Sequence, residues 1–210
     1  MKRKKPIRRT PLTDFNGSLI LPNDEPLIEY GNINEMCLED QEGYRIVFDS
    51  CTFEKITFSN NTFLKAEFID CIFKNCDLSN NTFTESTFMR VEFHDCKLIG
   101  CHVVDSYLEH VLFSKSQCRY LDFAENKIKC VTFKESNLLE SNWFENTMKY
   151  ITLDKCDFTK SSFYKNPFKG TDFSTCDFQE LKADLKSVEG ITIDSLQAEQ
   201  FCYLLGIKVK

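Results

Sequence analysis

The sequence predicts an all-β solenoid built of square coils, and two observations lead to this prediction. An interior-type residue recurs at every fifth position from Ile33 to Ile193 without a slip in register. Of the 20 Phe residues, only Phe15, Phe144 and Phe201 lie off this register. A period of five fits neither the roughly 3.6 residues of a helical turn nor the roughly 2 of a strand, so the chain must turn at each repeat.

Four such turns close a coil of twenty residues. Residues twenty apart in sequence would then stack about 4.8 Å apart, which is the spacing of hydrogen-bonded β backbones. The register gives about eight coils and a rod about 40 Å long. The large residues that we assign to its core are Phe48, Phe53, Phe58, Phe63, Phe68, Phe73, Phe83, Phe88, Phe93, Phe113, Phe123, Phe133, Trp143, Phe158, Phe163, Phe168, Phe173 and Phe178.

The position two before each central residue also faces inward and carries mostly Cys, Ser, Ala or Asn. Three pairs of Cys residues fall twenty apart in this position, namely Cys51 and Cys71, Cys76 and Cys96, and Cys156 and Cys176. A free Cys packs as a small buried hydrophobe, so we expect reduced structural thiols, with disulfides and metal binding as the alternatives. Asn126, Asn146 and Asn166 form one inward column, and we expect their amides to bond along it rather than to bind a ligand.

The sequence shows no catalytic constellation, so we predict that the protein is not an enzyme and has no catalytic, cofactor-binding or metal-binding residues. The chain has three His residues, and His94, His102 and His110 occupy outward positions of different repeats. We therefore expect them to point away from different faces, without a nucleophile beside them. The chain has no glycine-rich phosphate loop, with only 7 Gly in total.

Charge is segregated between the N-terminus and the body. The net charge is −6, but residues 1–12 hold six bases and no acid, so the body carries 20 bases against 32 acids, or −12. Residues 1–30 are predicted to be an irregular tail, either disordered and solubilising or in contact with nucleic acid or an acidic partner. No apolar run is long enough for a membrane span or a secretory signal, so we expect a soluble, cytoplasmic protein without a membrane partner.

One surface column of the predicted rod is acidic in four consecutive coils. Like charges about 4.8 Å apart destabilise a fold unless salt or a basic partner neutralises them. Apolar residues precede the acids on the same face, and Phe144 replaces a polar residue of the repeat. A docking site for a basic partner and a chance arrangement are the two interpretations. The candidate partner-binding residues are Glu85, Asp105, Glu125, Glu145, Val104, Phe144 and Tyr164.

The repeat extends over residues 31–193 and gives way to a C-terminal module, residues 194–210. A short helix is expected there, because Asp194 and Gln197 form a capping-box pattern and Gly206 is a suitable stop. Its apolar face would cover the open end of the core, and the remainder would favour a two-fold dimer. The candidate dimerisation residues are Leu196, Phe201, Leu204, Leu205 and Ile207.

The pattern of a small residue, a polar residue, Phe or Leu and two polar residues resembles the pentapeptide-repeat family. That resemblance implies a right-handed quadrilateral parallel β-helix. Gln197-Ala198, Leu205-Gly206-Ile207 and Asn142-Trp143 are similar to motifs of the Qnr-type quinolone-resistance proteins. This narrower resemblance implies an end-to-end homodimer that acts as an acidic DNA mimic and interacts with DNA gyrase and topoisomerase IV. The repeat here runs without the projecting loops of the best-known Qnr proteins.

Three hypotheses for function follow from the sequence. The first is a DNA mimic that binds type II topoisomerase and protects it from quinolones. The second is a protein-interaction scaffold of unassigned role that uses the aromatic and acidic face of Phe144 and Tyr164. The third, direct DNA binding through residues 1–9, is disfavoured because the acidic body repels phosphate.

Overall fold

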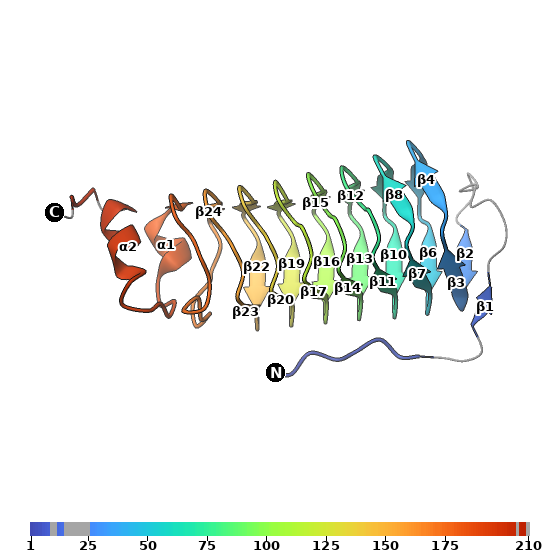
Figure 1. Cartoon of the computed structure of the whole chain (residues 1–210), viewed down its shortest axis with the longest axis horizontal. Helices are drawn as coiled ribbons and strands as arrows, with labels where there is room; N and C mark the ends of the chain where they lie inside the picture. The colour runs from blue at the N-terminus through green and yellow to red at the C-terminus, as the bar shows by residue number, and fades with distance from the viewer. Residues whose placement is uncertain (9–11, 15–25, 205, 209–210) are drawn as a thin grey trace.

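The computed structural model describes residues 1–8, 12–14, 26–204 and 206–208. Figure 1 shows coils stacked along one axis, with the helices at the C-terminal end of the stack. Residues twenty apart pair in parallel, as Phe53 does with Phe73 and Phe113 with Phe133. The prediction of a quadrilateral parallel β-helix with a coil of twenty residues is confirmed.

Each coil contributes to four faces, which we number in chain order. Face 1 contains β2 (Leu27–Glu29), β6 (Val47–Asp49), β10 (Glu67–Ile69), β13 (Thr87–Met89), β16 (Tyr107–Glu109), β19 (Lys127–Lys129) and β22 (Thr147–Lys149). Face 2 contains β1 (Thr13–Asp14), β3 (Gly31–Asn34), β7 (Thr52–Glu54), β11 (Ile72–Lys74), β14 (Glu92–His94), β17 (Leu112–Ser114), β20 (Thr132–Lys134) and β23 (Thr152–Asp154). Face 3 begins with β4 (Cys37–Glu39) and β8 (Thr57–Ser59) and continues as single bridges as far as Asp177. Face 4 contains β5 (Glu42–Tyr44), β9 (Thr62–Leu64), β12 (Thr82–Thr84), β15 (His102–Val104), β18 (Asp122–Ala124), β21 (Asn142–Phe144), β24 (Ser162–Tyr164) and β25 (Lys182–Ala183).

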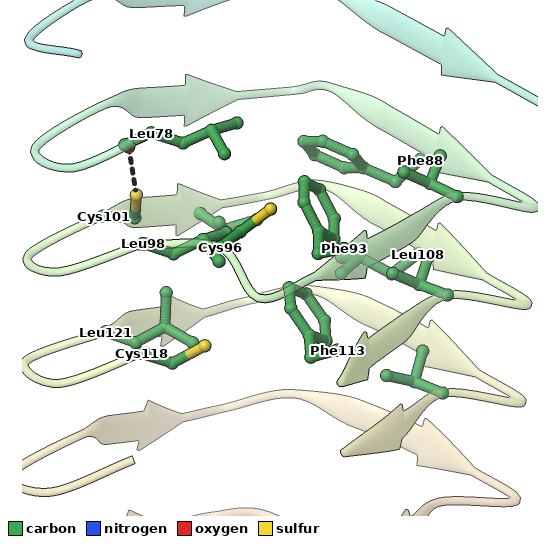
Figure 2. Packing of buried hydrophobic residues seen from close by; sticks show 14 of the residues in the cluster. Leu78, Phe88, Phe93, Cys96, Leu98, Cys101, Leu108, Phe113, Cys118 and Leu121 are labelled. Carbon is green, nitrogen blue, oxygen red and sulfur yellow. Dashed lines mark hydrogen bonds between the residues drawn. The ribbon is translucent and has the colours of Figure 1, made fainter. Parts of the chain in front are cut away.

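The aromatic residues form an axial core. Every large residue assigned to the core from the sequence is buried, and none of them is more than 4% exposed. Phe rings in consecutive coils stack face to face, with centroids 4.5 Å apart for Phe113 and Phe133, whereas Trp143 meets its axial neighbours Phe123 and Phe163 edge-on. Figure 2 shows Phe93 and Phe113 one above the other, and their rings lie within 7° of parallel. Each buried ring contributes roughly 1.5–3 kcal/mol before entropy is counted, so these stacks are the main source of stability.

The backbone at the corners of the coils adopts a left-handed conformation that the residue types at these positions do not indicate. From Tyr30 to Lys165 the residue two after each centre has a positive φ, and the non-glycine residues at this position have φ between 47° and 61°. Side chains make this left-handed region unfavourable in isolation, and Asn, Asp and Gly tolerate it best. The coil offsets the cost with a ladder bond at each corner, such as the one from Ser50 N to Ile69 O (2.8 Å).

Polar groups inside the rod bond along its axis. Asn126 N donates to Asn146 Oδ1 (3.0 Å), and Asn146 N donates to Asn166 Oδ1 (3.1 Å). The prediction that these Asn residues bond to one another along the column is therefore confirmed. Asn61 and Asn81 repeat the arrangement near the N-terminal end, where Asn61 N donates to Asn81 Oδ1 (2.8 Å). These bonds satisfy backbone amides that the coil buries.

The two helices lie at the C-terminal end of the rod (Figure 1). α1 (Leu185–Val188) begins at Asp184, whose carboxylate accepts from Ser187 N (2.8 Å). α2 (Ala198–Leu204) follows the predicted capping box, since Asp194 N donates to Gln197 Oε1 and Gln197 N donates to Asp194 Oδ1, both at 2.8 Å. Phe201 packs edge-on against Phe178, with ring centroids 5.3 Å apart, and so covers the end of the core. Neither helix in the described part of the chain is long and apolar enough to cross a membrane.

Residues 1–8 contact the body of the rod, which differs from the disordered tail that was one of the two interpretations of their composition. Residues 1–8 run along the outside of the rod, parallel to its axis (Figure 1). Ile7 N donates to Asp70 Oδ1 (2.8 Å), and Arg3 forms an ion pair with Glu92 (2.7 Å). The described part of the tail is held by specific side chains of the body, which is a finding that basic composition alone does not predict.

Candidate interaction surfaces

The predicted acidic column exists as a row of exposed corner residues between faces 4 and 1. Glu85, Asp105, Glu125 and Glu145 occupy consecutive coils of this row. Lysines flank it at both ends, because Lys65 pairs with Glu85 (3.3 Å) and Lys165 pairs with Glu145. Asp105 and Glu125 have no ion-pair partner among the residues that the structure describes. The unneutralised charge is therefore concentrated at the middle of the row.

The column at the opposite corner, between faces 2 and 3, behaves differently. Lys115 and Glu135 lie in consecutive coils there, and their charged groups are 4.0 Å apart. Similar axial pairs recur on the rod, such as Lys129 with Glu109 (2.6 Å). Opposite charges twenty residues apart are thus the common arrangement. The pair of Asp105 and Glu125 departs from it, which marks this row as the one suited to an external cation.

Aromatic residues lie beside the acidic row on face 4. Val104 and Phe144 are half-buried, whereas Tyr164 is 41% exposed. The ammonium of Lys165 lies over the Phe144 ring, 5.1 Å from its centroid. Sequence reasoning grouped these residues with the acids, and the structure places them on the same face, with Phe144 and Tyr164 paired in register.

The structure adds α1 to this aromatic pair. Phe144, Tyr164, Pro167 and Leu185 line an open groove of about 800 Å³, and Leu185 is 60% exposed. Lys165, Asp184 and Lys186 stand at its rim. Sequence reasoning missed the contribution of Leu185 because it predicted no helix at this point. The signal that could have found it is Asp184 three residues before Ser187, which is an N-cap spacing.

The C-terminal residues proposed for dimerisation divide into two groups. Phe201 and Leu204 are partly buried against the core, so they serve the cap of the rod. Leu196 is 86% exposed and Ile207 50% exposed. Leu205 lies outside the described residues. Tyr203, which the sequence analysis did not select, is 53% exposed and adds to this apolar end.

Nine of the cysteines are buried in the rod. All eleven cysteines are free, and burial raises the pKa of Cys101 to about 12, so this thiol stays protonated and inert at neutral pH. Its Sγ donates to Leu78 O at 2.9 Å (Figure 2). In the described ranges, no group of three or more His, Cys, Asp or Glu side chains is arranged to hold a metal ion.

The histidines differ from expectation at one position. His94 bonds to Glu92 (2.9 Å) and His102 lies 3.3 Å from Asp122, both at the surface as expected. His110 also occupies an outward corner of its repeat, but its side chain is not exposed to solvent, since it is buried with only 3% exposure. The reason is the N-terminal tail, because Lys4 N donates to His110 Nδ1 (3.1 Å) and covers the ring.

The repeat is matched by a known family model. Residues 46–118 and 66–143 match the family model described as Pentapeptide repeat region. The middle of the chain is a pentapeptide-repeat region. The residues matched by that model include the middle of the acidic row, so these acids decorate the regular part of the repeat.

Several solved structures are similar to this pentapeptide-repeat chain. A trypsin-treated form of QnrB1, a plasmid-mediated fluoroquinolone resistance protein, is 19% identical, with a TM-score of 0.41, and the match covers 88% of this chain and 99% of that chain. A pentapeptide repeat protein from the thylakoid lumen of Arabidopsis thaliana is 22% identical, with a TM-score of 0.35, and the match covers 42% of this chain and 65% of that chain. HetL from the cyanobacterium Nostoc is 10% identical, with a TM-score of 0.29 and coverage of 81% and 90%. No curated protein matches the sequence.

Proposed function

We propose that this pentapeptide-repeat protein acts by binding and not by catalysis, as an acidic rod that takes the place of DNA on a type II topoisomerase, either DNA gyrase or topoisomerase IV. The observation that carries the proposal is the exposed row of stacked acids, in which Asp105 and Glu125 have no ion-pair partner among the described residues. A surface that binds DNA is basic, and an unneutralised row of carboxylates gains most from such a partner.

The charge density of the body supports partial mimicry. A net charge of −12 over residues 13–210, spread along about 40 Å, is roughly one charge per 3 Å, whereas duplex DNA carries one per about 1.7 Å. The coil spacing of about 4.8 Å differs from the roughly 3.4 Å phosphate step of one strand. The likeness would therefore reside in the electrostatic field of the rod, without a match of individual carboxylates to phosphates.

The exposed C-terminal end supports a homodimer. Leu196, Tyr203 and Ile207 lie beyond the residues that cap the core, and they present apolar surface to solvent. Two copies joined end to end through this surface would double the length of the acidic rod. A longer rod would span more of a DNA-binding surface and would strengthen the attraction at low salt.

A supercoiling assay with purified DNA gyrase tests the proposal. Increasing amounts of the protein should inhibit supercoiling, and smaller amounts should reduce the cleavage that a quinolone induces. Both effects should weaken as the salt concentration rises, because the interaction is electrostatic. The absence of any effect on gyrase and on topoisomerase IV, at low as well as high salt, would refute the proposal.

A second candidate function is favoured by the groove beside Phe144. A volume of about 800 Å³ lined by Phe144, Tyr164, Pro167 and Leu185 fits an apolar anchor residue of a protein partner. In this function the protein is a scaffold. Phe144→Glu should abolish capture of that partner, while Leu64→Glu, at the equivalent position of face 4, should leave it intact. If the Phe144→Glu and Leu64→Glu variants captured the partner equally well, the groove would not be its binding site.

A further inference from the structure

The N-terminal segment lies in the corner between faces 1 and 2, away from the acidic row. Its two backbone contacts are three residues apart, at Lys4 and Ile7, while their acceptors, His110 and Asp70, are two coils apart. Two coils span about 9.6 Å, and three extended residues span about 10 Å. In an extended peptide that runs along the rod, backbone amides three residues apart therefore have the same spacing as acceptors two coils apart. The sequence of the peptide has little influence on this spacing, because the donors are main-chain amides.

Each contact ends on a buried group of the body. Ile7 N donates to Asp70 Oδ1 (2.8 Å), Lys4 N donates to His110 Nδ1 (3.1 Å) and Arg3 Nη2 donates to Glu92 Oε1 (2.7 Å). The exposed fractions of Asp70, His110 and Glu92 are 5%, 3% and 8%. Two of these contacts use main-chain amides, and the third requires a cationic side chain. The corner thus selects an extended, basic segment.

The body orients these acceptors with its own residues. Arg90 binds Asp70 in a bidentate manner, with Nε to Oδ1 at 2.6 Å and Nη2 to Oδ2 at 2.7 Å. His94 Nε2 lies 2.9 Å from Glu92 Oε2, which leaves Oε1 to Arg3. Although burial acts to raise the pKa of Glu92, bonds from His94 and Arg3 lower it, so the carboxylate stays ionised. Groups held in place before a peptide arrives make a binding site that costs little to organise.

We propose that this corner is a binding site for an extended basic peptide, and that residues 3–7 occupy it as a cover that a competing basic segment displaces. We call this site the strap corner, defined by Asp70, Glu92 and His110. The partner it fits has two backbone amides three residues apart and an arginine immediately before the first of them. This site is independent of the topoisomerase hypothesis, because the acidic row lies at the corner between faces 4 and 1.

The test uses the full chain and a labelled peptide of residues 1–8, followed by fluorescence anisotropy. The parent protein should bind the peptide weakly, because its own segment fills the strap corner. A full-length variant that combines Arg3→Glu with Ile7→Pro loses the ion pair and one amide donor, so its corner should be open. This variant should bind the peptide about tenfold more tightly than the parent does.

Charge-matched controls separate the site from general attraction. In the opened variant, Glu92→Gln should weaken peptide binding about tenfold. Glu125→Gln removes the same charge from the acidic row and should leave binding unchanged. Equal binding to the parent and the opened variant would overturn the proposal, and so would equal losses from Glu92→Gln and Glu125→Gln. Hydrogen exchange of the Lys4 and Ile7 amides in the parent gives a second readout, and unprotected amides would likewise contradict it.

Discussion

Replacing Asn146 by Leu, a residue of similar size, tests the axial polar column most severely. The Asn146 side chain accepts from Asn126 N (3.0 Å) and donates to Phe123 O (2.8 Å) and to Asn166 Oδ1 (2.9 Å). Leucine makes none of these bonds and leaves a backbone N–H and a C=O buried without partners. Each orphaned group costs about 1–3 kcal/mol, so we expect a loss of about 2–6 kcal/mol in the free energy of unfolding.

Asn146→Ser is the matched control, because Ser106 occupies the same column two coils earlier. Ser106 Oγ accepts from Ser86 N (2.9 Å), so a serine at 146 keeps an acceptor for Asn126 N. Its cost should be about 1–2 kcal/mol. Urea unfolding followed by circular dichroism measures both variants, and hydrogen exchange at the Asn126 amide reports local opening, since repeat proteins need not unfold in one step. If the Leu and Ser variants were equally stable, the assignment of these bonds as structural would be refuted.

Three further predictions follow. Tyr150 is 56% exposed and lies at a corner with φ 58°, a conformation that Asn tolerates better than Tyr does. Tyr150→Asn should therefore stabilise the rod by about 0.5 kcal/mol and raise its Tm. A lower Tm would contradict the backbone strain assigned to this corner. The substitutions Leu196→Glu and Tyr203→Glu should convert a dimer into a monomer in analytical ultracentrifugation, and an unchanged mass would exclude this end as the interface. Burial lowers the pKa of His110, so as the pH falls its imidazole takes up a proton more readily when residues 1–8 are undocked than when they are docked. Protection of the Lys4 amide from hydrogen exchange should therefore be complete above about pH 6.5 and should fall at lower pH. Protection that stays constant from pH 8 to 5 would contradict this prediction.

Most of the fold can be predicted from the register of the repeat. A residue such as Phe113 has its stacking partner twenty positions away, so a single period fixes face, neighbour and burial together. The bonds of Asn126 and Asn146 follow from the same register because a buried amide at that position lies against the coils before and after its own. In a solenoid, long-range contacts are encoded as a local period, which is why sequence reasoning succeeds there.

The features that sequence reasoning missed depend on contacts outside the period. His110 is buried because residues 1–8 cover it, and no local pattern links Lys4 to a residue in the middle of the chain. Leu185 joins the groove because the degraded repeat forms a short helix, where the lattice no longer positions side chains. The left-handed conformation of the corners could not be predicted from the sequence either. Residues such as Lys115 and Tyr150 adopt it, whereas a positive φ is usually indicated by glycine.

The most direct test of the account compares two double variants in the gyrase supercoiling assay. Asp105→Asn with Glu125→Gln removes the two charges of the acidic row that lack an ion-pair partner among the described residues, while Asp95→Asn with Glu135→Gln removes two charges from the column at the opposite corner, between faces 2 and 3. We predict that the first variant needs several times more protein than the parent for half-maximal inhibition, and that the second inhibits as the parent does. Equal inhibition by both variants would contradict the claim that the acidic row is the surface that gyrase binds.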